Sequence, residues 1–217
     1  MERLNKKTIA GFVFVLILLA AAALAWLKVE PRKQPKIPPA QTAGTTMDPA
    51  LTEGAFSFGP AEAKVTIIEF SDFECPYCKR SHSTIRQLGY RYKDAVKIVF
   101  KDYPAHKNSL TLALAARCAG EQNAFWAMHD KLFSRQGEFD LSELPKMAAE
   151  IGIDTKSFNG CLASKKYEAA IIKDFQDGER LAIKGTPTFL INGQMVAGDK
   201  PMEFWEQIIQ FILKNEK

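Results

Sequence analysis

The amino-acid sequence predicts an α/β fold in which a mixed β-sheet carries an inserted α-helical subdomain. An apolar run at residues 65–70 leads directly into a helix-like segment, and a second apolar run follows at residues 96–100. Helical periodicity then covers about residues 104–183, before a hairpin and an amphipathic helix. The expected order is therefore strand, helix, strand, long helical insertion, hairpin and helix.

A transmembrane helix is expected at the amino terminus. Residues 8–27 form an uncharged run of twenty residues, which at 1.5 Å per residue matches the roughly 30 Å of bilayer hydrocarbon. The basic stub of residues 1–7 should stay cytoplasmic. A cleaved signal peptide is the alternative, because Ala23 and Ala25 resemble a cleavage site, but the run is long for one and Trp26 suits an interfacial anchor. We expect a single-pass signal-anchor in a bacterial cytoplasmic membrane, with the domain in the periplasm or extracytoplasmic space.

Residues 28–55 are expected to be a linker between this anchor and the folded domain. The segment is rich in proline and has almost no apolar periodicity. Proline-rich chain extends at about 3.1 Å per residue, so it could hold the domain up to roughly 70 Å from the membrane. The linker is also too short to contain a dimerisation domain.

Composition limits the size of the folded core and the kinds of partner that the protein can bind. The chain has 217 residues and is 47% hydrophobic, enough for one sizeable core. Residues 1–50 contain 7 Lys and Arg against 3 Asp and Glu, whereas residues 51–217 contain 22 of each class. The folded part is therefore neutral, and nothing predicts nucleic acid binding.

The strongest candidate for chemistry is Cys75-Pro76-Tyr77-Cys78, at the junction between the strand at residues 65–70 and a helix. The thiolate is the reactive form of cysteine, and the positive end of a helix dipole stabilises a thiolate in the first turn. Pro76 suits the first helical position. Cys75 is therefore the expected nucleophile, and Cys78 the resolving thiol.

Three other interpretations compete with a redox pair: a structural disulfide, half of a zinc site, or two inert core cysteines. A zinc ribbon needs a second CxxC, and Cys118 and Cys161 stand alone. His82 is more simply a polar residue on an exposed helix face than a ligand. The motif and its strand-turn-helix setting favour redox chemistry, with no metal and no cofactor.

Acidic residues surround the motif. Glu69 lies six residues before Cys75 in an otherwise apolar run. It could face solvent at the strand end; if it is buried instead, desolvation should raise its pKa, and it could relay protons for the thiols. Asp72 and Glu74 are expected to be solvated loop acids.

The helical insertion is expected to pack its aromatic side chains in a core. Ser142 should cap a helix that ends near residue 151, and further helices are expected at residues 157–164 and 167–183. His106 and His129 are assigned to this core rather than to catalysis.

Cys118 and Cys161 are expected to form a structural disulfide that ties two helices of the insertion together. A chain outside the cytoplasm usually pairs the two cysteines that remain beside a redox pair. Two buried free thiols are the alternative.

The carboxyl-terminal part returns to strand character. Residues 185–191 and 194–197 are separated by Asn192-Gly193, which favours a tight hairpin. An amphipathic helix should then run from Pro201 to about residue 214.

Three separate motifs resemble the DsbA-type branch of the thioredoxin-like disulfide oxidoreductases: residues 69–78, the pattern at 118–129, and residues 185–189. The similarity covers about residues 56–214. It implies a thioredoxin-like fold whose helical subdomain is inserted at about residues 104–183.

The resemblance also implies individual roles. Cys75 would be the attacking thiolate and Cys78 its buried partner, with Pro187 as the family's cis proline beside them. Glu69 falls at the family's buried acidic position, and the backbone of Thr186 would pair with an extended substrate.

The sequence departs from the family in one informative way. The dipeptide between the cysteines is Pro76-Tyr77, where the best-known oxidases carry Pro-His, so one thiolate-stabilising group is absent. Thr186 occurs before the proline in isomerase-like relatives as well as in some oxidases.

We therefore expect an extracytoplasmic thiol:disulfide oxidoreductase that acts as a dithiol oxidase. It would introduce disulfides into unfolded or reduced exported proteins, with a membrane thiol oxidase or reductase as redox partner. A reductase or isomerase of the same fold is the first alternative. A chaperone-like module, or a metal-binding module that uses Cys75 and Cys78, is a more distant one.

Overall fold

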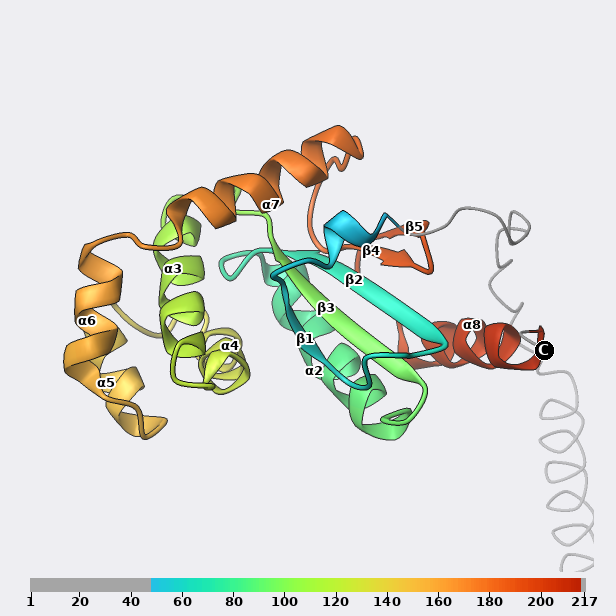
Figure 1. Cartoon of the computed structure of the whole chain (residues 1–217), viewed down its shortest axis with the longest axis horizontal. Coiled ribbons are helices and arrows are strands. Elements are labelled where there is room, and N and C mark those ends of the chain that lie inside the picture. The colour runs from blue at the N-terminus through green and yellow to red at the C-terminus, as the bar shows by residue number, and fades with distance from the viewer. Residues whose placement is uncertain (1–47, 216–217) are drawn as a thin grey trace, which may run out of the picture. The chain divides into compact units, whose positions relative to one another are not determined.

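The computed structural model describes residues 48–215, and the expected stub, anchor and most of the linker lie outside this part (Figure 1). Among the described residues, no helix is both long and apolar enough to cross a membrane. The sheet has five strands in the order β1-β3-β2-β4-β5. Their bounds are Phe56–Phe58 (β1), Val65–Ser71 (β2), Val96–Asp102 (β3), Thr188–Ile191 (β4) and Gln194–Ala197 (β5).

The strand directions place the end of β2 at the centre of the sheet. β2 pairs with β3 in parallel and with β4 in antiparallel, while β1 and β5 are antiparallel edge strands. All seven residues of β2 are buried. β4 and β5 meet across Asn192 and Gly193, which both have positive φ, as the predicted hairpin requires.

Helices cover both faces of the sheet. Ile67 and its neighbours pack against α2 (Pro76–Arg91) and α8 (Met202–Asn215). On the other face, Ile68 and Phe70 contact a cluster that includes Leu51 and Ile183. This alternation follows from the period of two along a strand.

The helical insertion follows β3 and forms its own core. Its helices are α3 (Ser109–Gly120), α4 (Phe125–Ser134), α5 (Leu144–Glu150), α6 (Thr155–Ala163) and α7 (Glu168–Arg180). Figure 1 shows α3 to α6 gathered beyond one end of the sheet, with α7 leading the chain back toward β4. Phe125 and Phe133 are fully buried in this core, which extends to Phe73 and both cysteines of the CxxC motif. The site therefore lies where the sheet meets the insertion.

A buried ion network fastens the insertion to the sheet. Lys101 of β3 is 1% exposed and contacts Asp174 and Asp177 of α7, with its Nζ 3.1 Å from an Asp177 oxygen. Arg117 of α3 contacts both Asp102 and Asp174. Charges buried this deeply need such partners, so the network fixes how α3 and α7 meet β3.

Three sequence-based expectations need correction. The short edge strand β1 was not expected, because three residues carry too little periodicity. Packing also begins before residue 56: Pro49–Leu51 forms a 3-10 helix inside the expected linker, and Leu51 is buried. Ser142 is not a cap, because Asp140 and Glu143 form a capping box around the 3-10 helix Leu141–Glu143 that precedes α5.

Candidate functional site

Cys75 lies at the amino end of α2. It is the residue before the first helical position, which Pro76 occupies, and its backbone is extended. The Cys75 amide donates to the Asp72 carbonyl at 3.1 Å, and the Lys79 amide donates to the Cys75 carbonyl at 3.1 Å. These bonds hold the thiol at the start of the helix, where the dipole favours negative charge.

The two thiols of the motif are free and sit in different environments. Cys75 is 5% exposed and Cys78 is 0% exposed. A hydrogen bond from the Cys78 side chain lowers the pKa of Cys75 to about 5, with further help from the Thr186 side chain and the backbone of Cys78 and Tyr77. Burial raises the pKa of Cys78. A proton is therefore lost first from Cys75.

The loop before β4 lies directly beside Cys75. The Cys75 Sγ donates to the Thr186 carbonyl at 3.2 Å, a contact that only the protonated thiol makes. The Thr186–Pro187 peptide bond is cis, as the family resemblance implies, and Pro187 is buried. Tyr77 points outward: it is 53% exposed, and the Arg80 guanidinium lies 4.3 Å from its ring centroid.

Glu69 is buried in β2, so it does not face solvent. It is 2% exposed, and its Oε1 has no hydrogen-bond partner among the described residues. Burial raises its pKa to about 7, and the Ser71 side chain acts in the opposite direction. The same Ser71 side chain lowers the pKa of Cys78. The Ser71 hydroxyl nevertheless makes no hydrogen bond within the part of the chain that the structure describes.

The structure overturns the assignment of Asp72 and Glu74 as solvated acids and of His106 as a core residue. Asp72 is 1% exposed. Its carboxylate accepts from the Ala105 amide and from His106 Nδ1, both at 2.7 Å, and from the Ser109 hydroxyl at 2.5 Å. Glu74 also accepts from Ser109, at 3.2 Å.

His106 is instead on the surface, with 45% of its side chain exposed, and Asp72 raises its pKa. Sequence reasoning missed this pair because its members lie 34 positions apart on two loops. Only the parallel pairing of β2 with β3, which brings the ends of both strands to one edge, could have suggested it.

A second polar cluster lies between α2 and α4. His82 Nε2 and His129 Nδ1 contact the same Asp130 oxygen at 3.0 and 2.8 Å, and Arg86 Nε lies 3.1 Å from it. His129 is buried, as expected, and burial lowers its pKa to about 4. The histidines and Asp130 could hold a metal ion by distance. However, Asp130 is already satisfied, and the Arg86 cation would repel an ion.

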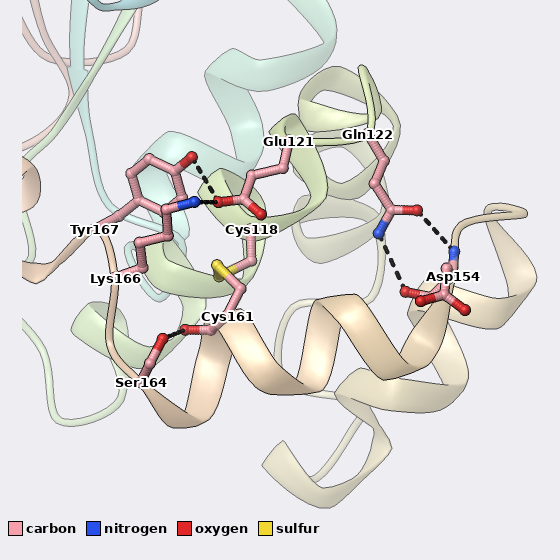
Figure 2. The surroundings of a disulfide bond; sticks show 8 residues. All are labelled: Cys118, Glu121, Gln122, Asp154, Cys161, Ser164, Lys166 and Tyr167. Carbon is pink, nitrogen blue, oxygen red and sulfur yellow. Dashed lines mark hydrogen bonds and ion pairs between the residues drawn. A yellow bond between two sulfur atoms is a disulfide. The ribbon is translucent and has the colours of Figure 1, made fainter.

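Cys118 and Cys161 form a disulfide that joins α3 to α6, with Cα atoms 5.8 Å apart (Figure 2). Polar contacts flank it on both sides. Glu121 accepts from the Tyr167 hydroxyl at 3.0 Å, and it contacts Lys166. On the other side, Gln122 bonds the backbone of residue 154 through both ends of its amide.

Comparison with known proteins places the chain in a family. A family model described as "Thioredoxin" matches residues 51–210. A thioredoxin-like oxidoreductase from Silicibacter pomeroyi DSS-3 is 26% identical, covers 74% of this chain and 92% of its own, and has a TM-score of 0.67. BdbD from Bacillus subtilis, in its oxidised form, is 25% identical, covers 75% and 94%, and has a TM-score of 0.69.

Curated relatives show the same domain within longer proteins. The Na(+)/H(+) antiporter NhaA 1 of Salinispora arenicola is 31% identical over 200 residues, which is 85% of this chain but 30% of that protein. NhaA 3 of Salinispora tropica is 36% identical over 148 residues, or 67% of this chain and 22% of that protein. The chain thus spans less than a third of the length of these relatives.

These comparisons agree with the geometry. They confirm the resemblance to DsbA-type proteins and the thioredoxin-like fold with a helical insertion. With a matched family model over most of its length, the chain belongs to the thioredoxin family.

Proposed function

We propose that this protein is a thiol-disulfide oxidoreductase that works as a dithiol oxidase on exported proteins. The observation that carries the proposal is the asymmetry of the two thiols: the pKa of Cys75 is lowered to about 5, whereas burial raises the pKa of Cys78. A redox pair needs this asymmetry, because one thiol must attack and leave as a thiolate while the other stays inside.

The reaction begins with the oxidised Cys75–Cys78 disulfide. A substrate thiolate attacks the Cys75 sulfur, the bond between the two cysteines breaks, and its electron pair leaves on Cys78. Because Cys78 is fully buried, its thiolate takes up a proton. Glu69 is a suitable donor, since it is buried in β2, the strand that leads into the motif, and its pKa is raised to about 7.

The second step releases an oxidised substrate. A second substrate thiolate attacks the substrate sulfur of the mixed disulfide, and Cys75 leaves as a thiolate. The substrate has lost two electrons, which now reside in the Cys75–Cys78 dithiol. A membrane thiol oxidase must remove these electrons before another cycle.

The proposed direction of electron transfer, from substrate to protein, follows from the stability of the Cys75 thiolate that the reaction releases. Each unit by which the pKa of Cys75 falls favours the reduced form by about 1.4 kcal/mol. A protein whose reduced form is stabilised in this way is a strong oxidant. The lowered pKa of Cys75 therefore supports an oxidase rather than a reductase.

Substrate binding is proposed at the loop that precedes β4. Thr186 is partly exposed and lies against Cys75, so its backbone can pair with an extended polypeptide beside the nucleophile. Tyr77 adds an exposed aromatic surface next to it. Backbone pairing demands little of the substrate sequence, which suits a range of unfolded clients.

The proposed location is the outer side of the cytoplasmic membrane. The uncharged run at residues 8–27 supports an anchor, and the Cys118–Cys161 disulfide suits an oxidising compartment. Confinement near the membrane would bring the domain within reach of a membrane redox partner.

Thermal melts of the oxidised and reduced forms test whether the protein is an oxidase or a reductase. Mass spectrometry verifies that Cys118 and Cys161 remain paired. We expect the reduced form to melt higher. A reduced form that melts lower would identify a reductase instead. Insulin reduction, together with metal analysis before and after thiol alkylation, separates both outcomes from a chaperone-like or metal-binding module.

A further inference from the structure

A glutamine of the helical insertion binds the backbone of the turn that contains the nucleophile. Gln136 follows the end of α4, and its side-chain nitrogen donates to the Phe73 carbonyl at 2.7 Å and to the Cys75 carbonyl at 3.0 Å. Each of the two amide hydrogens therefore has an acceptor. Because both acceptors are carbonyl oxygens, the nitrogen of the side-chain amide must face the turn and its oxygen must point away.

These two bonds complete the turn at residues 72–75. Within the turn, the Cys75 amide donates to the Asp72 carbonyl at 3.1 Å, and the Glu74 amide donates to the Asp72 side chain at 2.8 Å. Neither bond uses the carbonyl of Phe73, a residue that is 1% exposed. A buried carbonyl needs a donor, and here the insertion supplies one through Gln136.

A lysine closes the link from the side of α2. The Lys79 amide donates to the same Cys75 carbonyl at 3.1 Å, and Lys79 Nζ donates to the backbone carbonyl of Gln136, also at 3.1 Å. Cys75, Lys79 and Gln136 thus form a closed ring of hydrogen bonds. The ring fixes the carbonyl of the nucleophile from its own helix and from the insertion at once.

The segment that carries Gln136 is itself held by backbone bonds. The Gln136 amide donates to the Phe133 carbonyl at 3.3 Å, and the Glu138 amide donates to the Arg135 carbonyl at 2.9 Å. Gly137 has a φ of 81°, a conformation that suits glycine. Gln136 therefore reaches the turn at residues 72–75 from a second turn whose backbone is also fixed.

We propose that Gln136 is a positioning residue for Cys75, through which the helical insertion controls where the reactive sulfur lies. The Cys75 Sγ contacts the Thr186 carbonyl at 3.2 Å and lies at the positive end of α2, and both depend on the placement of the Cys75 backbone. The inference rests on the proposed function of Cys75 as nucleophile. It gives the insertion a direct part in thiol exchange.

Loss of the Gln136 amide should change the thiol as well as the stability of the fold. Stabilisation of an anion by the end of a helix falls off within one turn, so a displaced Cys75 thiolate loses part of it. The pKa of the Cys75 thiol should therefore rise. A glutamine that only satisfied a buried carbonyl would change the free energy of unfolding and leave the ionisation of the thiol as it is.

Gln136→Met tests this, because methionine resembles glutamine in shape but has no amide to donate. The rate of iodoacetamide labelling at Cys75 is measured by mass spectrometry from pH 4 to pH 8. We expect labelling to slow about fivefold at pH 5, which corresponds to a rise of about one unit in the thiol pKa. At pH 8 the thiol is ionised in both proteins, and the rates should agree within about twofold.

Gln122→Met is the matched control. Gln122 also belongs to the insertion, and its side chain makes two hydrogen bonds to the backbone of residue 154, at 2.8 and 3.1 Å. This variant should keep the pH profile of the wild type. If Gln136→Met has the same profile as Gln122→Met, the role of Gln136 fails and the proposed function stands. If wild-type Cys75 does not react below pH 7, the proposed function itself fails.

Nuclear magnetic resonance provides a second test, on the unaltered protein. Since each side-chain amide proton of Gln136 has an acceptor, both should exchange with solvent at least about tenfold more slowly than those of glutamine in an unfolded peptide. Exchange at the rate of the unfolded peptide would show that the bonds to Phe73 and Cys75 are absent in solution, and it would overturn the inference.

Discussion

The protein contains two pairs of cysteines, and they lie at opposite ends of helices. Cys75 immediately precedes the first turn of α2, whereas Cys118 and Cys161 occupy the last turns of α3 and α6. The amino end of a helix stabilises a thiolate, and the carboxyl end does not. The position of Cys75 at the amino end of α2 therefore adds to the hydrogen bonds that lower its pKa, whereas Cys118 and Cys161 are bonded to each other.

The two cysteine pairs also differ in how well the polar groups around them are hydrogen-bonded. The Cys118–Cys161 bond is flanked by satisfied polar contacts, such as that between Glu121 and Tyr167. Beneath the reactive pair, an oxygen of Glu69 and the hydroxyl of Ser71 have no hydrogen-bond partner among the described residues. Unsatisfied buried groups are uncommon in native folds, so Glu69 and Ser71 are candidates for a chemical role.

The largest expected effect separates the two pairs directly. Cys75→Ser should abolish iodoacetamide labelling at pH 6 and thiol exchange with a reduced polypeptide, a loss of at least about a hundredfold, because only this thiol has a lowered pKa. Cys78→Ser should instead accumulate mixed disulfides at Cys75. Both are measured by mass spectrometry after a fixed labelling time.

The matched control is the double variant Cys118→Ala/Cys161→Ala, which should label at the wild-type rate. Unchanged alkylation in Cys75→Ser would show that the nucleophile has been misassigned.

The second prediction concerns stability, to which the Cys118–Cys161 pair should contribute more than the Cys75–Cys78 pair. Cys118→Ala/Cys161→Ala should lower the free energy of unfolding by up to about 4 kcal/mol, because the disulfide closes a loop between residues 43 positions apart. For a domain of this size that corresponds to roughly 8–16 °C in melting temperature. Urea denaturation at pH 7 measures it.

The double variant Cys75→Ala/Cys78→Ala is the comparison for this experiment. It removes two thiols that are free in the structure, so it should not lose the loop-closure contribution. Equal destabilisation by the two double variants would contradict a structural role for the Cys118–Cys161 bond.

The sequence predicts features that depend on neighbouring residues better than features that depend on residues far apart in the chain. The CxxC motif, the helix after it and the buried run around Glu69 are local, and each was predictable from spacing and periodicity. The pair of Asp72 and His106 was not, because it forms only when two loops meet at one edge of the sheet. Neither residue carries a local signal of the other, which is why Asp72 was wrongly assigned to solvent and His106 wrongly assigned to the core.

Two errors in the fold have the same origin. β1 has three residues and exists because its backbone pairs with β3, so no local pattern reveals it. Leu51 is buried although the surrounding sequence is rich in turn-forming residues. Tertiary contacts supply the information in both cases.

The third prediction is that the stability of the reduced form depends on pH through Cys75. Cys75 has a lowered pKa in the folded protein, so its contribution to the stability of the reduced form is complete above the unfolded value of about 9 and is lost as the pH falls through about 5. We expect a contribution of roughly 2–3 kcal/mol at pH 7 and under about 0.5 kcal/mol at pH 5. The difference in melting temperature between the reduced and oxidised forms should shrink accordingly.

This measurement is made below pH 9, because the raised pKa of Cys78 acts against the reduced form at higher pH. The oxidised protein is the internal control, since its cysteines do not titrate. A difference that stays constant from pH 7 to pH 5 would rule out a stabilised Cys75 thiolate.

The last prediction concerns Glu69, the buried acid of β2, whose substitution should have the smallest effect on thiol exchange. Burial raises the pKa of Glu69 from 4.5 to about 7, so the folded state favours the protonated carboxyl. The resulting stability is complete below pH 4.5 and is lost as the pH rises through 7. Glu69→Gln removes the titration, and we expect it to lie within about 1 kcal/mol of wild type at pH 5 and to be more stable by up to about 3 kcal/mol at pH 8.

The same substitution should slow thiol exchange severalfold, because an amide cannot supply a proton to the Cys78 thiolate. A gain in stability with a loss of activity is the signature of a group retained for chemistry rather than for folding. Glu62→Gln, on the exposed segment before β2, is the matched control and should change neither property. If Glu69→Gln lowered stability at pH 8 as much as at pH 5, the carboxyl would have a buried partner in solution, and its role as a proton donor to Cys78 would be withdrawn.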